Sequence, residues 1–193
     1  MRVFIAIIVL IFSLQSWTKA DDIKDFEIEG MSIGDSLLNF FSEDEIKKTF
    51  LYKSNEYYSF SSTKYSSENY DGIQFHVKNN DKTFTITAIE GVKLFQNNIN
   101  ECIRLKKTIV NELSSLFIDA KKIDDSGNHV YDPTGDSKFY RTSFFTSPED
   151  KWSSIEVGCF DWSEKLEKRF GDKLTVGIKT QIFQKFTIEE AYK

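Results

Sequence analysis

The chain has 193 residues, of which 28% are charged, and a formal net charge of −5. A chain of this length is expected to form one domain. Its acidic balance excludes nucleic-acid binding through a basic surface, because Lys and Arg contacts to phosphate supply most of that affinity. With only two cysteines and two histidines, a scaffold of several disulfides and a histidine-rich metal centre are also excluded.

The first 20 residues have the pattern of a cleaved signal peptide. An apolar run over 3–14 follows a basic residue, and small residues, Thr18 and Ala20, precede a cleavage site at Asp21. As a helix the run is about 18 Å long, too short for a bilayer core of about 30 Å. We therefore expect a periplasmic or secreted protein whose mature part, 21–193, is a single domain without a membrane span. Cleavage removes two basic residues and no acidic one, which moves the net charge to −7.

Two short helices are expected at the start of the mature chain. An Asp-Ser pair at 35–36 precedes apolar residues over 37–41 and can cap a helix there. Ser42 and Glu45 fit a capping box. A second helix after this box would direct apolar residues over 46–51 to the core.

The middle of the chain predicts a β-hairpin. Residues 57–61 have the composition of an aromatic strand, and apolar residues alternate with polar ones over 73–77. Turn residues at 79–81 lead into a further strand over 83–94, in which Gly91 indicates a bulge or bend.

The long helix is predicted over 96–119, where apolar residues recur at spacings of three and four for about five turns. A polar loop is expected over 121–136. Three strands should end the chain, at 138–146, 153–162 and 173–183. This order predicts an α+β fold in which an antiparallel sheet of about five to six strands packs against one long helix, with two short N-terminal helices.

The two cysteines are expected to form a disulfide. Cys102 lies on the apolar stripe of the predicted long helix, and Cys159 alternates with Ile155 and Val157 in a predicted strand. Both sulfur atoms should then face the same core, and an exported domain favours their oxidation. The alternative is two buried free thiols.

Ser36 is the one candidate nucleophile, because residues 34–37 spell Gly-Asp-Ser-Leu, the string that names a family of esterases and lipases. That chemistry needs a histidine base and an acid, which the family carries as D-x-x-H near the C-terminus. Neither His76 nor His129 stands in such a motif. We interpret Ser36 as a helix cap, predict no catalytic residues, and keep the serine hydrolase as an alternative.

Aspartates at 124–128 and 132–136 resemble calcium loops, but the spacing of such a loop is not met. Solvated turns are the preferred interpretation, and no metal or cofactor is predicted. The 18 Phe, eight Tyr and three Trp are interpreted as core filling.

Phe160 and Trp162 point to the side of their strand opposite Cys159. We expect the N-terminal helices to cover them. If they are exposed instead, they mark a binding surface, since contiguous exposed aromatic residues gather at functional sites.

Two stretches, 28–38 and 157–163 together with 174–178, resemble a family of small exported proteins of unknown function from AT-rich marine bacteria. The Gly-Met-Ser turn at 30–32 is similar to the opening of the outer-membrane assembly lipoproteins of the SmpA/OmlA type. That second likeness implies short helices followed by antiparallel strands, and a role in assembling outer-membrane proteins.

Together these features predict an exported, non-catalytic binding or envelope-associated module. Its partner would be a protein or a small-molecule ligand in the envelope, and not a nucleic acid. The alternatives are the hydrolase that uses Ser36 and an outer-membrane assembly factor.

Overall fold

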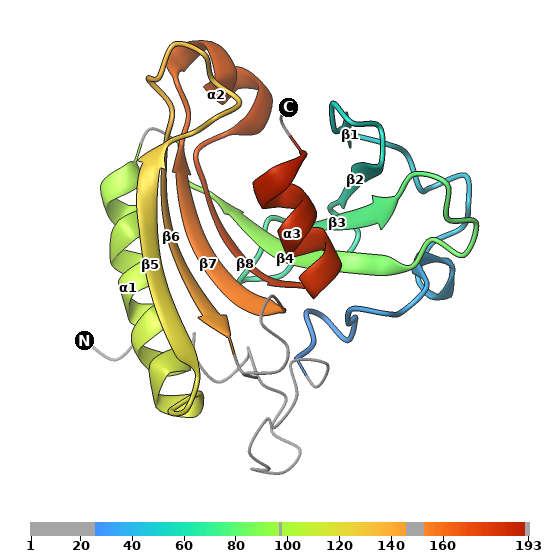
Figure 1. Ribbon diagram of the computed structural model, residues 1–193, viewed down its shortest axis with the longest axis horizontal. Coiled ribbons are helices and arrows are strands. Elements are labelled where there is room, and N and C mark those ends of the chain that lie inside the picture. The colour runs from blue at the N-terminus through green and yellow to red at the C-terminus, as the bar shows by residue number, and fades with distance from the viewer. Residues whose placement is uncertain (1–25, 97, 146–152, 192–193) are drawn as a thin grey trace.

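The structure, a computed structural model, describes residues 26–96, 98–145 and 153–191. One eight-stranded antiparallel sheet has the strand order β1-β2-β3-β4-β8-β7-β6-β5 (Figure 1). Its strands are β1 (Phe50–Leu51), β2 (Tyr57–Ser62), β3 (Gly72–Lys78), β4 (Ile86–Leu94), β5 (Lys121–Asn128), β6 (Lys138–Phe145), β7 (Ser154–Asp161) and β8 (Lys173–Lys179). The helices are α1 (Ile99–Leu116), α2 (Glu164–Phe170) and α3 (Gln181–Glu189), with a 3₁₀ turn η2 (Leu37–Asn39).

One face of the sheet is apolar because alternate residues of each strand point to it. Residues directly opposite each other in register share a face, so a single buried row runs across six strands. Its members are Phe60, Phe75, Ile89, Ile178, Ile155 and Phe144. This row is the centre of the main hydrophobic core.

The long helix α1 lies on the β7–β8 part of this apolar face (Figure 1). It begins where the Asn98 side chain accepts a hydrogen bond from the Glu101 N–H, and it buries the predicted apolar stripe, including Leu113. As predicted, Cys102 and Cys159 form a disulfide, with their Cα atoms 6.0 Å apart. The bridge fixes α1 to the centre of the sheet.

The N-terminal segment, residues 26–49, covers the β2–β3 part of the same face. The Phe41 ring makes edge-to-face contacts with Phe60 at 5.1 Å and Phe75 at 5.6 Å between centroids. Met31 and Leu37 are fully buried beside them. The main hydrophobic core therefore lies between this face of the sheet and α1 with this segment. A second, smaller cluster of buried residues packs α3 on the other face.

The predicted fold class is wrong, because the sheet has eight strands and the two N-terminal helices are absent. A single 3₁₀ turn replaces the first helix. At the predicted capping box the Ser42 N–H does donate to Glu45 Oε2 at 2.7 Å. No helix follows, because Phe50 and Leu51 instead pair with β2 as an edge strand. Tertiary pairing overrides the local capping signal.

The polar segment after α1 is also not the expected loop. Its first half is the edge strand β5, all of whose residues are exposed. A strand with no covered face needs no apolar alternation, so the sequence pattern does not reveal it. The strand expected over 173–183 ends at Lys179, because the Thr180 side chain accepts a hydrogen bond from the Phe183 N–H and starts α3.

The sheet is strongly curved, and its concave side is the one opposite α1. Phe50 of the first strand in the sheet order contacts Tyr131, which follows β5, with ring centroids 5.7 Å apart. It also contacts Phe170 of α2 at 6.3 Å. The two ends of the sheet thus approach each other, and α3 lies on the concave side in front of β4 and β8 (Figure 1).

The predicted signal peptide, 1–20, and its cleavage site between Ala20 and Asp21 lie outside the described residues. Among the residues that are described, none of the helices has both the length and the apolar character needed to cross a membrane.

Candidate functional site

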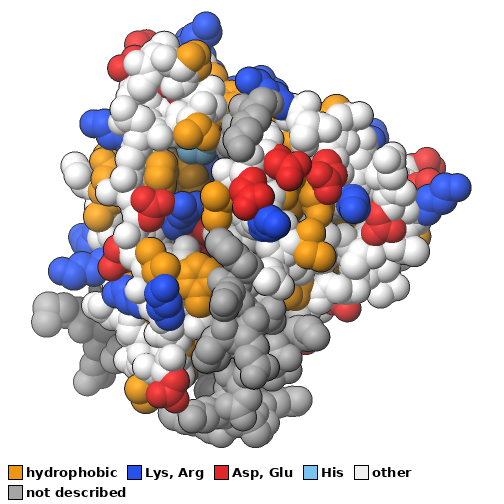
Figure 2. All heavy atoms as spheres, in the orientation of Figure 1, with side chains coloured by type: hydrophobic (Ala, Val, Ile, Leu, Met, Phe, Trp, Pro, Cys, Tyr) orange, Lys and Arg blue, Asp and Glu red, His pale blue; other side chains and the backbone are white. Residues whose placement is uncertain are grey.

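The concave face of the sheet borders a half-open cavity of about 930 Å³. Seven of the strands contribute to its lining, together with residues 129–131, α2 and α3. In Figure 2, hydrophobic side chains and a histidine are visible in a recess of this face between the α2 end and α3. Clefts that hold small organic ligands have volumes of about 300–1,000 Å³.

The floor of the cavity carries buried charges, because the polar positions of the alternating strands point to this side. Glu90 of β4 and Glu156 of β7 both lie opposite Gly177 of β8, one on each side of it. The Lys179 ammonium bridges the two carboxylates, with Nζ 3.2 Å from Glu90 Oε1 and 2.7 Å from Glu156 Oε1. All three charged side chains are buried.

Glu90 and Lys179 are ionised. Burial alone would raise the pKa of Glu90, but the Lys179 ammonium and His76 outweigh it and hold that pKa well below its ordinary value. Burial alone would lower the pKa of Lys179, and the carboxylates of Glu156 and Glu90 raise it above its ordinary value. Glu156 also faces the Arg141 guanidinium at 3.8 Å. The charged side chains of the floor are therefore paired with one another.

Next to the triad, His76 is held between aromatic groups. Its Nδ1 lies 3.0 Å from the Tyr52 hydroxyl, its Nε2 lies 3.7 Å from Glu90 Oε2, and the Phe183 ring lies 4.6 Å from the imidazole. Burial lowers its pKa, against the opposing effect of Glu90. The imidazole is neutral at pH 7 and closes the α3 end of the floor.

An aromatic wall lines the α2 end of the cavity. Phe160 and Trp162 lie nearly parallel, with an interplanar angle of 13° and centroids 6.3 Å apart. Trp162 also contacts His129 at 4.5 Å and Phe170 at 4.7 Å. We use the name aromatic wall for these four residues and Tyr131, all of which line the cavity.

The expectation that N-terminal helices cover Phe160 and Trp162 is wrong, because the N-terminal segment lies on the other face of the sheet. Both rings are half-buried and line the cavity. The buried indole Nε1–H of Trp162 has no hydrogen-bond partner in the part of the chain that the structure describes. A binding role for these two residues stays a prediction.

Lys173 stands beside the aromatic wall. It lies opposite Phe160 in register and lines the cavity. Among the described residues, no carboxylate comes within ion-pair distance of its Nζ. This differs from Lys179, six residues further along β8. Burial lowers the pKa of Lys173, with Glu90 opposing the shift. Burial together with the charges of Lys173 and Arg141 lowers the pKa of His129 to about 4.

The other predicted positions are not part of this cavity. Ser36 Oγ donates to the Thr83 carbonyl at 2.5 Å and accepts from the Leu38 N–H, which is the predicted capping role. The aspartates over 124–128 lie in β5, where Asp125 accepts from Arg141 at 2.6 Å. Asp132 accepts from the Thr134 and Ser137 hydroxyls, which keep its pKa below the ordinary value. Within the described ranges, no group of three or more metal-ligand side chains occurs.

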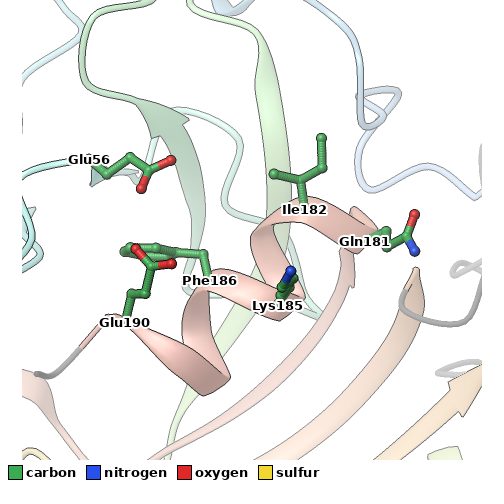
Figure 3. Close-up of a pocket in the computed structure, with 6 residues that line it drawn as sticks. All are labelled: Glu56, Gln181, Ile182, Lys185, Phe186 and Glu190. Carbon is green, nitrogen blue, oxygen red and sulfur yellow. The ribbon is translucent and has the colours of Figure 1, made fainter.

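A second, smaller hollow of about 390 Å³ lies on the outer side of α3. Figure 3 shows its six lining residues, five of them on or just after α3, with Glu56 facing them from the chain before β2. Lys185 pairs with Glu189 on the helix surface at 4.0 Å. This arrangement has the character of a solvated helix face.

Sequence reasoning missed the residues that make the floor. Glu90, Glu156 and Lys179 each follow an isoleucine in a strand, and a charged residue after an apolar one is the usual pattern of a solvated face. Two of the three residues lie in strands that are buried on both faces: six consecutive residues of β7 and six of β8 are buried. A strand buried on both faces must cover its charges.

Comparison of the chain with protein-family models, with curated proteins and with solved structures gives no match. The two family resemblances therefore stay predictions, and the function is argued from the site.

Proposed function

We propose that this protein is an exported, non-catalytic binding protein that holds a small organic ligand on the concave face of its sheet. The single observation that carries the proposal is the cavity of about 930 Å³, with an aromatic wall at one end and a polar floor. Small-molecule sites combine mainly apolar linings with a few fixed polar groups, which is the composition found here.

The state of the polar groups supports binding over catalysis. A general base or nucleophile needs a perturbed group that is free to exchange a proton with a substrate. Here Glu90 and Glu156 share the Lys179 ammonium, and His76 is enclosed by Tyr52 and Phe183. These contacts stabilise fixed charges, which orient a ligand.

Export is the second part of the proposal. It is supported by the Cys102–Cys159 disulfide, because such bridges persist in oxidising compartments. The N-terminal sequence supports it as well. The test is the intact mass of the protein recovered from the periplasm or the medium, which should correspond to a chain that begins at Asp21 and has lost two hydrogens through oxidation.

Ligand binding is tested with N-phenyl-1-naphthylamine, a neutral aromatic probe that becomes fluorescent in apolar surroundings. Val92 lines the cavity near the C-terminal end of β4 and is half-buried. In protein produced from the full chain, Val92→Trp places a bulky ring in the cavity and should abolish saturable binding. Ile123→Trp on the exposed edge strand β5 is the matched control and should bind like the wild type.

Melting curves show whether each variant is folded. Saturable binding that Val92→Trp removes and Ile123→Trp preserves supports the proposal. Binding that is unaffected by Val92→Trp places the probe elsewhere and overturns it, and so does a wild-type protein that binds no probe. If Val92→Trp does not fold, Ser61→Trp at the exposed rim of the same cavity takes its place.

A further inference from the structure

The charges that line the cavity are paired unevenly. Lys179 is bound to two carboxylates, and Arg141 lies 2.6 Å from Asp125 and 3.8 Å from Glu156. In the described part of the chain, Lys173 is the lining lysine without a carboxylate at ion-pair distance. A cation held in a partly desolvated site without a counter-ion raises the free energy of the empty protein, so an anion brought by a ligand would be stabilised there.

A second basic residue near Lys173 also lacks a carboxylate partner among the described residues. It lies opposite Phe160, at the end of the cavity formed by the aromatic wall. Arg169 lines the same end, where its guanidinium lies 5.0 Å from the centroid of the Phe170 ring and has no carboxylate partner among the described residues. The acidic lining residues outside the floor are Glu189 and Glu190, from the opposite end at α3, and Asp71, whose Oδ2 accepts a hydrogen bond from the Leu94 N–H. The lining beside the aromatic wall therefore carries two cations, Lys173 and Arg169, that form no ion pair among the described residues.

The neighbouring groups indicate what else the ligand carries. The nearly parallel rings of Phe160 and Trp162 present flat apolar surface, on which another ring packs in offset or edge geometry. The Nε1–H of Trp162, which has no hydrogen-bond partner among the described residues, is a buried donor in the same wall, and such a group is costly unless an acceptor satisfies it. A flat body and an anionic acceptor group would satisfy all of these features together.

We propose that the ligand of this cavity is an organic anion with a flat, unsaturated body, whose anionic group binds Lys173 while its body packs against the aromatic wall. This rests on the proposed function and adds the class of ligand and the residue that selects it. The recognised chemistry is that of an aromatic carboxylate, sulfonate or phosphate.

The test compares two probes with the same body. N-phenyl-1-naphthylamine is neutral, and 8-anilinonaphthalene-1-sulfonate adds one sulfonate to that skeleton. We expect the anionic probe to bind the wild-type protein at least about tenfold more tightly, an effect typical of a charge-assisted contact. Lys173→Met should weaken the anionic probe about tenfold and change the neutral probe less than about twofold.

Two variants serve as controls. Lys168→Met removes one exposed charge from α2, near the same end of the molecule, and should leave both affinities unchanged. Lys173→Arg keeps the charge and should keep the preference for the anionic probe. If Lys173→Met does not fold, Lys173→Arg is used instead, and the affinities of both probes are measured at increasing salt concentration. Only the affinity for the anionic probe should then decrease.

The results separate this inference from the proposed function. If neither probe binds, the proposed function fails. If the neutral probe binds and Val92→Trp removes it, but the anionic probe shows no preference or keeps it in Lys173→Met, the cavity binds ligands and the inference alone is overturned. A preference lost equally in Lys168→Met would also overturn it, because it would reflect the net charge of the protein.

Discussion

Gly177 is the residue on which the charged floor depends. A Cβ atom at this position would lie 2.5 Å from the Ile89 carbonyl oxygen and 2.6 Å from Glu90 Cγ. The strands β4 and β8 can approach only because no side chain is present. This close approach brings Glu90 and Glu156 to the same ammonium group.

We therefore expect Gly177→Ala to lower the free energy of unfolding by about 1–3 kcal/mol, the usual effect of forcing an extra carbon into a packed interior. Gly127→Ala is the matched control in an exposed strand, where the added carbon would lie 3.6 Å from the Phe139 ring, an ordinary contact. It should change stability by less than about 0.5 kcal/mol. Denaturant titration measures the free energy of unfolding of both variants. Equal stabilities would show that the strands move apart without loss.

Lys179 is the residue that pairs with two buried carboxylates. Lys179→Met leaves Glu90 and Glu156 without their shared partner, and breaking a buried pair in this way costs about 3–5 kcal/mol. Lys185→Met, in an exposed pair on α3, should cost less than about 1 kcal/mol. Chemical denaturation at pH 7 measures both effects.

The pH dependence of this loss has a definite sign. In the wild type the pKa of Glu90 is held below its ordinary value of 4.5, so its contribution to stability is present above that pH and is lost as the pH falls. In Lys179→Met the buried Glu90 should have a raised pKa, because burial is then no longer outweighed by the ammonium, and stability is lost as the pH rises. The difference between wild type and variant should shrink below about pH 5. A difference that is constant from pH 7 to pH 4 would contradict the ionised pair of Glu90 and Lys179.

At the scale of elements, α1 and its disulfide are the parts that the sequence predicts best. The apolar stripe of α1 repeats for the full length of the helix, and both cysteines stand on apolar faces of their elements. Local pattern is enough here because each face packs against one partner only. The strands β3, β4 and β7 are also predicted from the local sequence, and apolar residues recur at every second position in β3 and β7.

Elements whose pattern depends on distant contacts are not predictable in this way. β1 forms because Phe50 and Leu51 pair with β2. β5 forms because it pairs with β6 at the edge of the sheet. The cavity requires that the sheet curve until Phe50 meets Tyr131, a contact between residues far apart in the chain. Sequence alternation identifies the two faces of the sheet but does not show that one of them borders a cavity.

The packing of α1 is tested by truncating its buried face. Leu113 is 3% exposed, and Leu113→Ala should lower the free energy of unfolding by about 2–5 kcal/mol. Leu116 lies on the same helix and is 50% exposed, so Leu116→Ala should cost less than about 0.5 kcal/mol. Similar losses in the two variants would mean that the helix is rotated from the face described here.

The disulfide makes a separate contribution. It closes a loop between residues 57 positions apart, for which chain entropy gives a stabilisation of up to about 4 kcal/mol. Reduction should lower the melting temperature, and alkylated protein should keep the lower value. An unchanged melting temperature after complete reduction would show that the cross-link does not stabilise the α1–β7 contact.

At the scale of the whole molecule, the two faces of the sheet differ in what covers them. The convex face carries the core, with α1 and the N-terminal segment packed on it. The concave face is left to α2, α3 and the segment around His129, which meet around the cavity and leave its interior unfilled. A single sheet thus has a packed core on one face and a half-open cavity on the other.

The most direct test of this division is to locate a bound neutral probe by intermolecular nuclear Overhauser effects. With N-phenyl-1-naphthylamine at saturation, we expect contacts from the probe to Val92, Phe160 and Trp162 on the concave face. Contacts confined to the exposed apolar residues Leu116 and Ile118 would contradict the account, because the probe would then lie on the outer surface of the molecule.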